Sequence, residues 1–202
     1  MAELVEARQQ GRARGLVALT FDDGYADFLE YAVPVLQKYG FNGTVFVLPG
    51  LLGGHNEWDP ERQRKRLMTA DEVRQVADAG VEVGSHGLRH VSLPKADEAT
   101  LHAEIAESRS RLQELVGSRT QVRGFCYPYG HTDSQAAAAV RAAGYDYACA
   151  IAPSKLLGPF AVPRTPVHDG DTSWRLYAKW GRSALQVGNR FAVRHHLRQS
   201  EG

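Results

Sequence analysis

Apolar, strand-like runs alternate with helical stretches along most of this chain, and this alternation limits the fold more than any other feature. The strand-like runs lie at residues 16–21, 44–48, 81–83, 122–126, 145–151 and, more weakly, 161–167. Strands separated by helices of this length form βαβ units with right-handed crossovers, which predicts a mainly parallel α/β sheet. Five or six such units fit either an open doubly wound sheet or a barrel, and periodicity does not decide between them.

The helical stretches carry recognisable end signals. Thr69 and Glu72 have the spacing of a capping box, and Gly80 is a natural residue to end the helix that they begin. Pro34 is expected either to begin the last turns of the helical stretch at residues 25–39 or to kink it. A further helix has a single apolar face, made of Leu101, Ile105, Ser108, Leu112 and Leu115.

Length and composition are those of one globular domain. The chain has 202 residues, of which 43% are hydrophobic and 23% charged. A chain of this size buries enough surface to fold without disulfides or a structural metal. We therefore expect one domain over 1–202, with its motifs within about 15–170 and a terminal segment at 181–202. Cys126 and Cys149 both fall in strand-like runs, which predicts two buried, reduced thiols.

The charge balance argues against two classes of partner. Lys and Arg number 24 against 23 Asp and Glu, a formal net charge of +1, so the chain lacks the basic footprint of proteins that bind nucleic acid or anionic membranes. Residues 1–15 lack the apolar core of a signal peptide, and no apolar run reaches the length of a membrane span. As written the chain is expected to be cytoplasmic, although a secreted protein trimmed of its leader would look the same. The oligomeric state is not predicted.

Polar side chains of ligand type follow four of the strand-like runs. They lie in the segments 22–24, 85–90, 127–130 and 168–169. In parallel α/β folds the reactive residues gather at the carboxyl ends of the strands, on the loops that lead into the helices. These four segments are therefore expected to contribute to one site.

The first two segments have the composition of a metal site. Asp22 and Asp23 are adjacent carboxylates, which a nearby cation would relieve of mutual repulsion; a simple Asp-Gly turn is the alternative. His86 and His90 are four residues apart, and on a helical turn this spacing puts both imidazoles on one side; two ordinary loop histidines are the alternative. Two histidines and one carboxylate leave an open position for water, as catalytic zinc sites do. The second carboxylate can then act as a general base, which predicts a hydrolase.

Several ordered motifs give the chain a resemblance to a known family. They are Leu19-Thr-Phe-Asp-Asp-Gly-Tyr25, Gly84-Ser-His-Gly-Leu-Arg-His90, Phe125-Cys-Tyr-Pro-Tyr-Gly130 and Ala142-Ala-Gly-Tyr145. Over about residues 15–150 the sequence resembles the polysaccharide deacetylases, the metal-dependent family 4 carbohydrate esterases that remove acetyl groups from amino sugars. The resemblance implies a distorted, incomplete (β/α) barrel with parallel strands. It also implies a carbohydrate substrate, an N-acetylated polysaccharide or oligosaccharide.

The resemblance assigns roles to individual residues. The ligands of a divalent ion would be Asp23, His86 and His90. Zn²⁺ is the expected ion, with Co²⁺ and Ni²⁺ as alternatives. Asp22 would be the general base that takes a proton from the attacking water. A backbone N–H near Tyr129 would help to hold the oxyanion, and three residues would wall the acetyl pocket, namely Tyr127, Pro128 and Tyr129.

The sequence also departs from the family pattern. Gly87 stands where the family usually has Ser or Thr, so a hydroxyl that would order the loop is missing. Cys126 stands where many members have an Arg that orients the base, and we hypothesise that Arg164 takes over this task. The family's general acid is a late histidine, for which His168 is the best candidate and His131 the second.

The remaining predictions concern tryptophans and rival functions. Trp58 lies on the long loop at the reactive end and is expected to bind a sugar ring, whereas Trp174 and Trp180 are expected to pack in a core. A metal-retaining, carbohydrate-binding pseudoenzyme is the rival from another class. Hydrolysis of O-acetyl esters or of non-peptide amides would use the same machinery on a different substrate.

Overall fold

The computed structural model describes residues 1–151, 158–179 and 181. Cα packing divides the chain into two compact units, Met1–Pro163 and Arg164–Gly202, and each is described by itself. In the described part of the chain, no helix combines the length and apolarity that a membrane crossing requires. The prediction of one domain over 1–202 stays a prediction.

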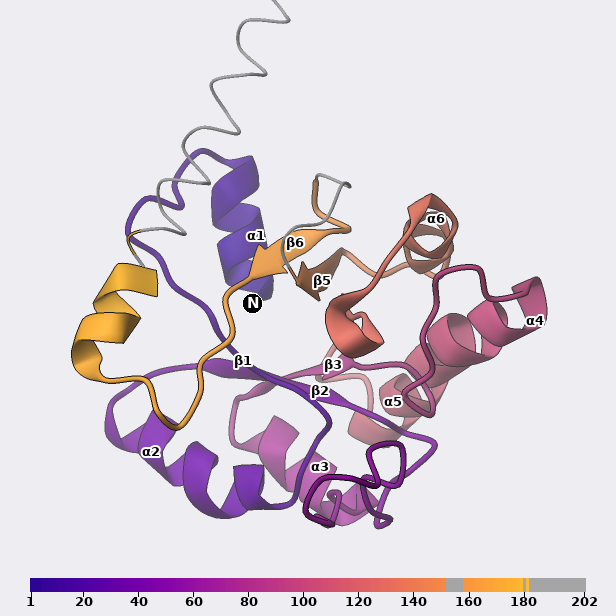
Figure 1. Ribbon diagram of the computed structural model, residues 1–202, viewed down its shortest axis with the longest axis horizontal. Helices are drawn as coiled ribbons and strands as arrows, with labels where there is room; N and C mark the ends of the chain where they lie inside the picture. Colours follow the sequence, from indigo (N-terminus) through magenta and orange to yellow (C-terminus); the bar gives the residue numbers. More distant parts are fainter. Residues whose placement is uncertain (152–157, 180, 182–202) are drawn as a thin grey trace, which may run out of the picture. The chain divides into compact units, whose positions relative to one another are not determined.

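One six-stranded sheet organises the fold, with its strands in chain order from β1 to β6 (Figure 1). The strands are β1 (Leu19–Phe21), β2 (Gly43–Val47), β3 (Glu82–Ser85), β4 (Gly124–Cys126), β5 (Tyr147–Ile151) and β6 (Val162–Arg164). The pairs from β1 to β5 are parallel. Each strand overlaps a predicted strand-like run, and the sheet curls into a half-barrel. The predicted incomplete (β/α) barrel is therefore confirmed, and the doubly wound sheet is excluded.

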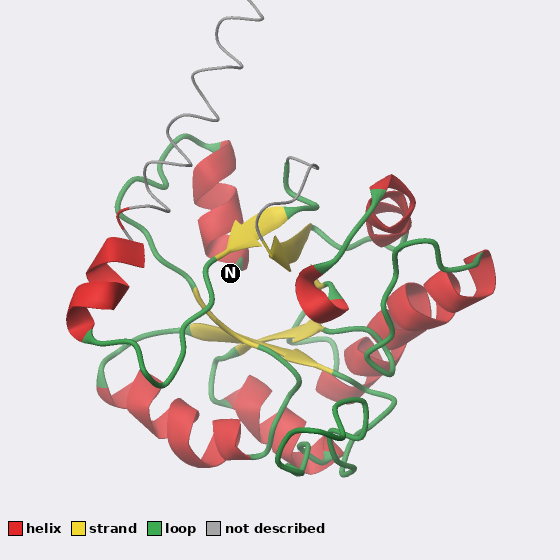
Figure 2. Cartoon of the chain, viewed as in Figure 1, coloured by secondary structure: helices red, strands yellow, loops and turns green. Residues whose placement is uncertain are grey.

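The helices connect successive strands, as Figure 2 shows. They are α2 (Val33–Lys38), α3 (Ala70–Asp78), α4 (Glu98–Leu101), α5 (Ser108–Val116) and α6 (Ser134–Ala142), with the π-helical turns η1 (Phe28–Ala32) and η2 (His102–Glu107) and the 3₁₀ turn η3 (Pro128–Gly130). The predicted capping box is confirmed: the Glu72 N–H donates to Thr69 Oγ1 at 3.3 Å, and the Thr69 N–H donates to Glu72 Oε2 at 2.8 Å. Pro34 lies in the first turn of α2, where it needs no hydrogen-bonded N–H.

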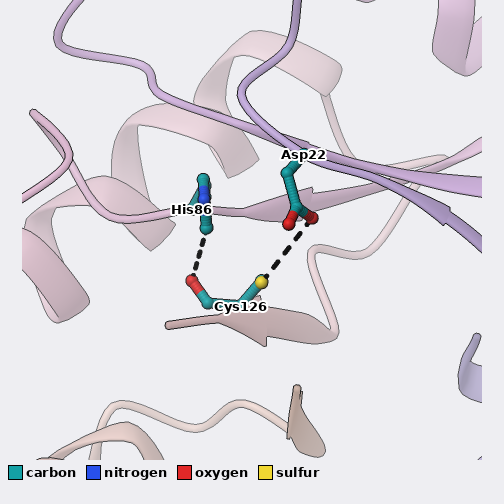
Figure 3. A group of neighbouring side chains, drawn as sticks. All are labelled: Asp22, His86 and Cys126. Atoms are coloured by element: carbon teal, nitrogen blue, oxygen red, sulfur yellow. Dashed lines mark hydrogen bonds between the residues drawn. The ribbon is translucent and has the colours of Figure 1, made fainter. Parts of the chain in front are cut away.

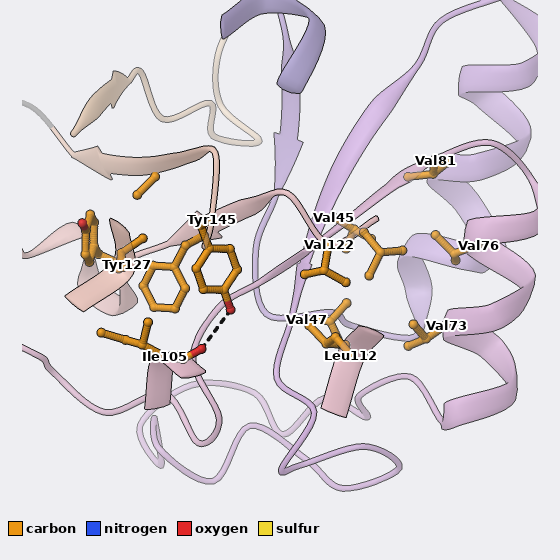
Figure 4. Packing of buried hydrophobic residues seen from close by; sticks show 14 of the residues in the cluster. Val45, Val47, Val73, Val76, Val81, Ile105, Leu112, Val122, Tyr127 and Tyr145 are labelled. Atoms are coloured by element: carbon orange, nitrogen blue, oxygen red, sulfur yellow. Dashed lines mark hydrogen bonds between the residues drawn. The ribbon is translucent and has the colours of Figure 1, made fainter. Parts of the chain in front are cut away.

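The main core lies between the sheet and its covering helices (Figure 4). Val45 and Val47 of β2 pack with Val73 and Val76 of α3 and with Leu112 of α5. On the helix face predicted at positions 101–115, the first four residues are buried as expected, and Leu115 is partly buried against the same core. Burial of branched side chains on both sides is typical of parallel strands, which helices cover.

A second, smaller cluster holds a helix that the sequence analysis did not predict. Helix α1 (Ala2–Gln9) buries Ala2 and Val5 against the strands. Its partners include Phe46, Cys126, Tyr147, Cys149 and Val162. Two small apolar side chains do not give a polar sequence a recognisable apolar helix face, so the pattern did not predict this helix. Both cysteines are buried thiols that form no disulfide among the described residues, as predicted.

The second unit corrects one prediction. Trp174 is 79% exposed, so the expected core packing is wrong for this residue. It lies in a helical segment at 173–179, and Tyr177, one turn further on, is also exposed. Trp180 lies outside the described residues.

Candidate functional site

The carboxyl ends of β1, β3 and β4 bring the predicted ligands together. Asp22 and Asp23 directly follow β1, His86 directly follows β3, and Cys126 is the last residue of β4. Asp23 and Gly24 both have left-handed backbone conformations, with φ of 71°. Asp tolerates this conformation better than most residues and Gly tolerates it best, so the chain turns sharply here. The turn leaves both carboxylates at the end of the strand.

Asp23 lies between the two histidines. Its Oδ1 is 3.3 Å from His86 Nε2 and 3.4 Å from His90 Nε2, and the three ligand atoms lie within 4.8 Å of one another. Asp23 Oδ1 is buried and has no hydrogen-bond partner among the described residues. A buried carboxylate oxygen without a donor is costly, and a cation between the three atoms would remove this cost. The donor set of two nitrogens and one oxygen fits a divalent ion of the zinc type.

The tautomer of His86 supports the same conclusion. Its Nδ1 lies 2.7 Å from the carbonyl oxygen of Cys126 (Figure 3). Because a carbonyl oxygen only accepts, Nδ1 carries a hydrogen, and in the neutral ring the lone pair is on Nε2, facing Asp23. A backbone carbonyl that fixes the second nitrogen is the usual support of a metal-binding histidine.

The two histidines differ in their electrostatics. Burial acts to lower the pKa of His86, but the carboxylates of Asp23 and Asp22 outweigh it and hold that pKa above its ordinary value. Burial and the neighbouring His86 lower the pKa of His90 to about 4. His90 is therefore neutral at pH 7, which is the form that binds metal ions.

The loop from His86 to His90 differs from the expected helical turn. Gly87 has φ of 89° and His90 has φ of 65°, both outside the helical region. The two imidazoles still converge, with ring centroids 5.0 Å apart. The spacing of four residues thus brings both rings to one place, but the conformation that does so is a loop.

Asp22 lies beside Cys126, which stands at the position where the sequence analysis expected an arginine. The Cys126 thiol donates to Asp22 Oδ1 at a sulfur–oxygen distance of 3.7 Å, as Figure 3 shows. Asp22, His86 and Cys126 also have ligand atoms within 4.8 Å of one another. The sequence marked Cys126 as a departure but did not predict this contact, because the contact joins β1 to β4.

Aromatic rings flank His90. Trp58 stacks on its imidazole, with centroids 4.6 Å apart and planes 25° apart, and Tyr129 meets it edge-on at 4.6 Å. Trp58 thus lies at the reactive end, as predicted. Tyr127 is buried in the main core, where its ring packs edge-on against Phe125. Its hydroxyl donates to the carbonyl of residue 160 at 3.0 Å, and Pro128 is also buried.

Two predicted site residues, Arg164 and His168, belong to the second unit, and one buried residue, Glu104, was not predicted. Arg164 ends β6 and begins the second unit, and His168 is an exposed residue of that unit whose N–H donates to Asp171. The roles predicted for both remain predictions. Glu104, on η2, was missed altogether although it is buried. The available signal was its position beside the apolar stripe, one turn after Leu101 and four residues before Ser108.

Comparisons with known proteins identify the family of the chain. Residues 9–148 match the family model described as polysaccharide deacetylase. The chain is 26% identical over 172 residues to YxkH of Bacillus subtilis, covering 84% of this chain and 57% of that protein. It is 25% identical over 177 residues to the poly-beta-1,6-N-acetyl-D-glucosamine N-deacetylase of Staphylococcus aureus, covering 81% and 58%. The chain therefore spans less than two thirds of the length of these relatives.

Among solved structures, the Streptococcus pyogenes deacetylase PplD, in complex with acetate, shares the fold. The TM-score is 0.73 at 21% identity, over 88% of this chain and 76% of that one. The family model covers all three motif segments that supply Asp22, Asp23, His86, His90 and Cys126. The chain belongs to the polysaccharide deacetylase family.

Proposed function

We propose that this chain is a metal-dependent hydrolase that removes acetyl groups from N-acetylated amino sugars in a polysaccharide or oligosaccharide. The observation that carries the proposal is the convergence of Asp23, His86 and His90 around a buried carboxylate oxygen without a donor. Family membership supports the reaction class. The Staphylococcus aureus relative, named for N-deacetylation of a glucosamine polymer, supports the substrate class.

The metal would be held by Asp23, His86 and His90. Zn²⁺ suits two imidazoles and one carboxylate, and Co²⁺ and Ni²⁺ accept the same donors. When bound, such an ion polarises an acyl oxygen and makes a water molecule more acidic. His86 supplies its Nε2 lone pair because the Cys126 carbonyl holds the hydrogen on Nδ1.

The remaining chemistry falls to protein side chains and the backbone. Asp22 takes the proton of the attacking water, and the Cys126 thiol fixes one of its oxygens. A backbone N–H near Tyr129 donates to the developing oxyanion. Trp58 offers a ring surface next to His90 to a sugar. His168 would protonate the departing amine, and Arg164 would orient Asp22.

Acetate release tests the proposal directly. Zinc-reconstituted protein would be incubated with N-acetylglucosamine oligomers of β-1,4 and β-1,6 linkage, and with O-acetylated sugars, beside the variant Asp22→Asn. This variant should keep zinc binding but lose about 10²–10⁴-fold in rate, since it removes the general base. Asp27→Asn is the matched control, because Asp27 is a half-exposed carboxylate that pairs with Lys65.

Each outcome is informative. Release that falls in Asp22→Asn but not in Asp27→Asn supports the proposal, and the preferred sugar identifies the substrate. Release from O-acetylated sugars alone would change the substrate to an ester. If the wild type binds zinc and the oligomers but releases no acetate, the proposal is wrong and a carbohydrate-binding function replaces it.

A further inference from the structure

The loop between the two histidines is held by a carboxylate that the proposed reaction does not use. Glu104 Oε2 accepts the N–H of Leu88 at 2.8 Å and the N–H of Arg89 at 3.0 Å. Glu104 is 4% exposed, so this is a buried charged acceptor shared by two consecutive backbone donors. Hydrogen bonds to a charged group are about twice as strong as neutral ones, and their loss leaves the buried N–H of Leu88 unpaired.

The helix that carries Glu104 also holds the beginning of the loop. The Gly87 N–H donates to Ser85 Oγ at 3.2 Å, and Ser85 Oγ lies 2.9 Å from Ser108 Oγ. Ser108 in turn donates to the carbonyl of Glu104 at 2.7 Å. Three consecutive loop N–H groups, those of residues 87, 88 and 89, are thus bonded to side chains of β3 or of η2. A buried loop needs such partners because the sheet supplies none for it.

Gly87 and Glu104 fit each other sterically. A Cβ atom added at Gly87 would lie 2.7 Å from Glu104 Oε2, closer than real Cβ contacts. The φ of +89° at Gly87 would in addition strain any L side chain. Because Gly87 has no side chain, the Glu104 carboxylate can occupy this space. Position 87 has no hydroxyl that could order the loop, and the Glu104 carboxylate orders it instead.

The backbone of His90 is strained, and contacts with the surrounding structure have to hold it in place. His90 has a left-handed backbone, with φ of 65°, which persists only where the surroundings determine it. Residues 88 and 89 directly precede His90, and both are anchored on Glu104. The carboxylate therefore fixes the backbone that aims the His90 ring at Asp23.

From these contacts we infer that Glu104 is a positioning residue of the metal centre. Its carboxylate fixes the backbone of Leu88 and Arg89, and this places His90 for binding a divalent ion together with Asp23 and His86. The inference rests on the proposed function, because it assumes that these three residues bind metal. The contact between Glu104 and the loop does not depend on that assumption.

Two measurements on four variants test the inference. Glu104→Ala removes the acceptor, Glu104→Gln keeps an oxygen acceptor of the same size, and Gly87→Ala places a methyl group where the carboxylate lies. Glu107→Ala is the control, since Glu107 is a half-exposed residue of the same helix that pairs with Arg111. Amide hydrogen exchange at residues 88 and 89 is measured in the metal-free protein, and Zn²⁺ affinity by competition with a chromophoric chelator.

We expect Glu104→Ala to speed exchange at both amides by about 10-fold or more and to weaken Zn²⁺ binding by about 10–100-fold, as loss of outer-shell support does elsewhere. Gly87→Ala should do the same. Glu104→Gln should recover most of the affinity, and Glu107→Ala should match the wild type. A purely structural role would alter stability without this pattern of rescue in Zn²⁺ affinity.

Two failures are distinguishable. If the wild type binds Zn²⁺ and Glu104→Ala binds it equally tightly, or leaves both amides protected, the inference is wrong. If the wild type binds no Zn²⁺, or His86→Ala binds it as well as the wild type, the proposed function fails and the positioning role with it, whatever the amides show. Should Glu104→Ala not fold, Gly87→Ala and Glu104→Gln decide the question with the same two measurements.

Discussion

Zinc should stabilise the folded protein, because the proposed ligands already converge in the native state. Asp23 Oδ1 already lies 3.3 and 3.4 Å from the two histidine Nε2 atoms, so the native state offers a formed site and the unfolded chain does not. A ligand that binds only the native state stabilises it by about 2.7 kcal/mol when its free concentration is 100 times its dissociation constant. For a chain of this size each kcal/mol raises Tm by about 2–4 °C. Zinc should therefore raise Tm by about 5–11 °C.

Scanning calorimetry with a chelator and then with Zn²⁺ measures this shift. His90→Ala removes one of the three ligands and should lose most of it. His102→Ala is the control, because His102 is exposed and belongs to neither group of candidate metal ligands among the described residues. The reasoning is refuted if Zn²⁺ leaves the Tm of the wild type unchanged up to about 1 mM, or if His90→Ala shifts as much as the wild type.

Four further predictions concern stability and substrate binding. Thr69→Ala should cost about 1 kcal/mol in urea unfolding, because the Glu72 N–H loses its acceptor. Hydrogen bonds from Arg66 lower the pKa of Glu72 to about 2, so its contribution is present above pH 4.5 and lost as the pH falls toward 2. Glu72→Gln should flatten the pH dependence of stability in that window, by no more than about 1 kcal/mol for so exposed a pair. Leu112→Ala should cost about 2–5 kcal/mol, and a cost below about 1 kcal/mol would contradict its place in the core. Trp58→Ala should raise KM for oligosaccharides roughly 2–10-fold while Trp58→Phe changes it little, and equal effects of both would exclude ring contact with the sugar.

Local patterns predicted the elements of this fold well. The apolar runs identified all six strands, and the Thr69–Glu72 pair identified the start of a helix to the residue. Both signals depend on residues within about four positions of one another, so one sequence is enough to detect them. Helix α1 was not predicted, because its buried face consists of only Ala2 and Val5, whose partners come from distant strands.

The candidate site was likewise predictable in its residue types but not in its geometry. The residue types at the strand ends singled out Asp22, Asp23, His86 and His90 as candidates, because two imidazoles and one carboxylate are a common donor set for zinc, and the resemblance to the family then assigned their roles. Their distances were not predictable, because they depend on the curl of the sheet and on a loop conformation that the helical spacing described wrongly.

Other features of the site were decided by tertiary structure alone. Cys126 lies beside Asp22 because β4 and β1 meet at the same end of the half-barrel, 104 residues apart in sequence. Glu104 accepts the loop N–H groups because a π-helical turn presents its carboxylate to Gly87, which has no side chain in the way. The sequence by itself determined which chemical groups this protein has at its strand ends. The packing of helix η2 against the loop after β3 decided how those groups are held, since hydrogen bonds between distant segments form only once the sheet has brought them together.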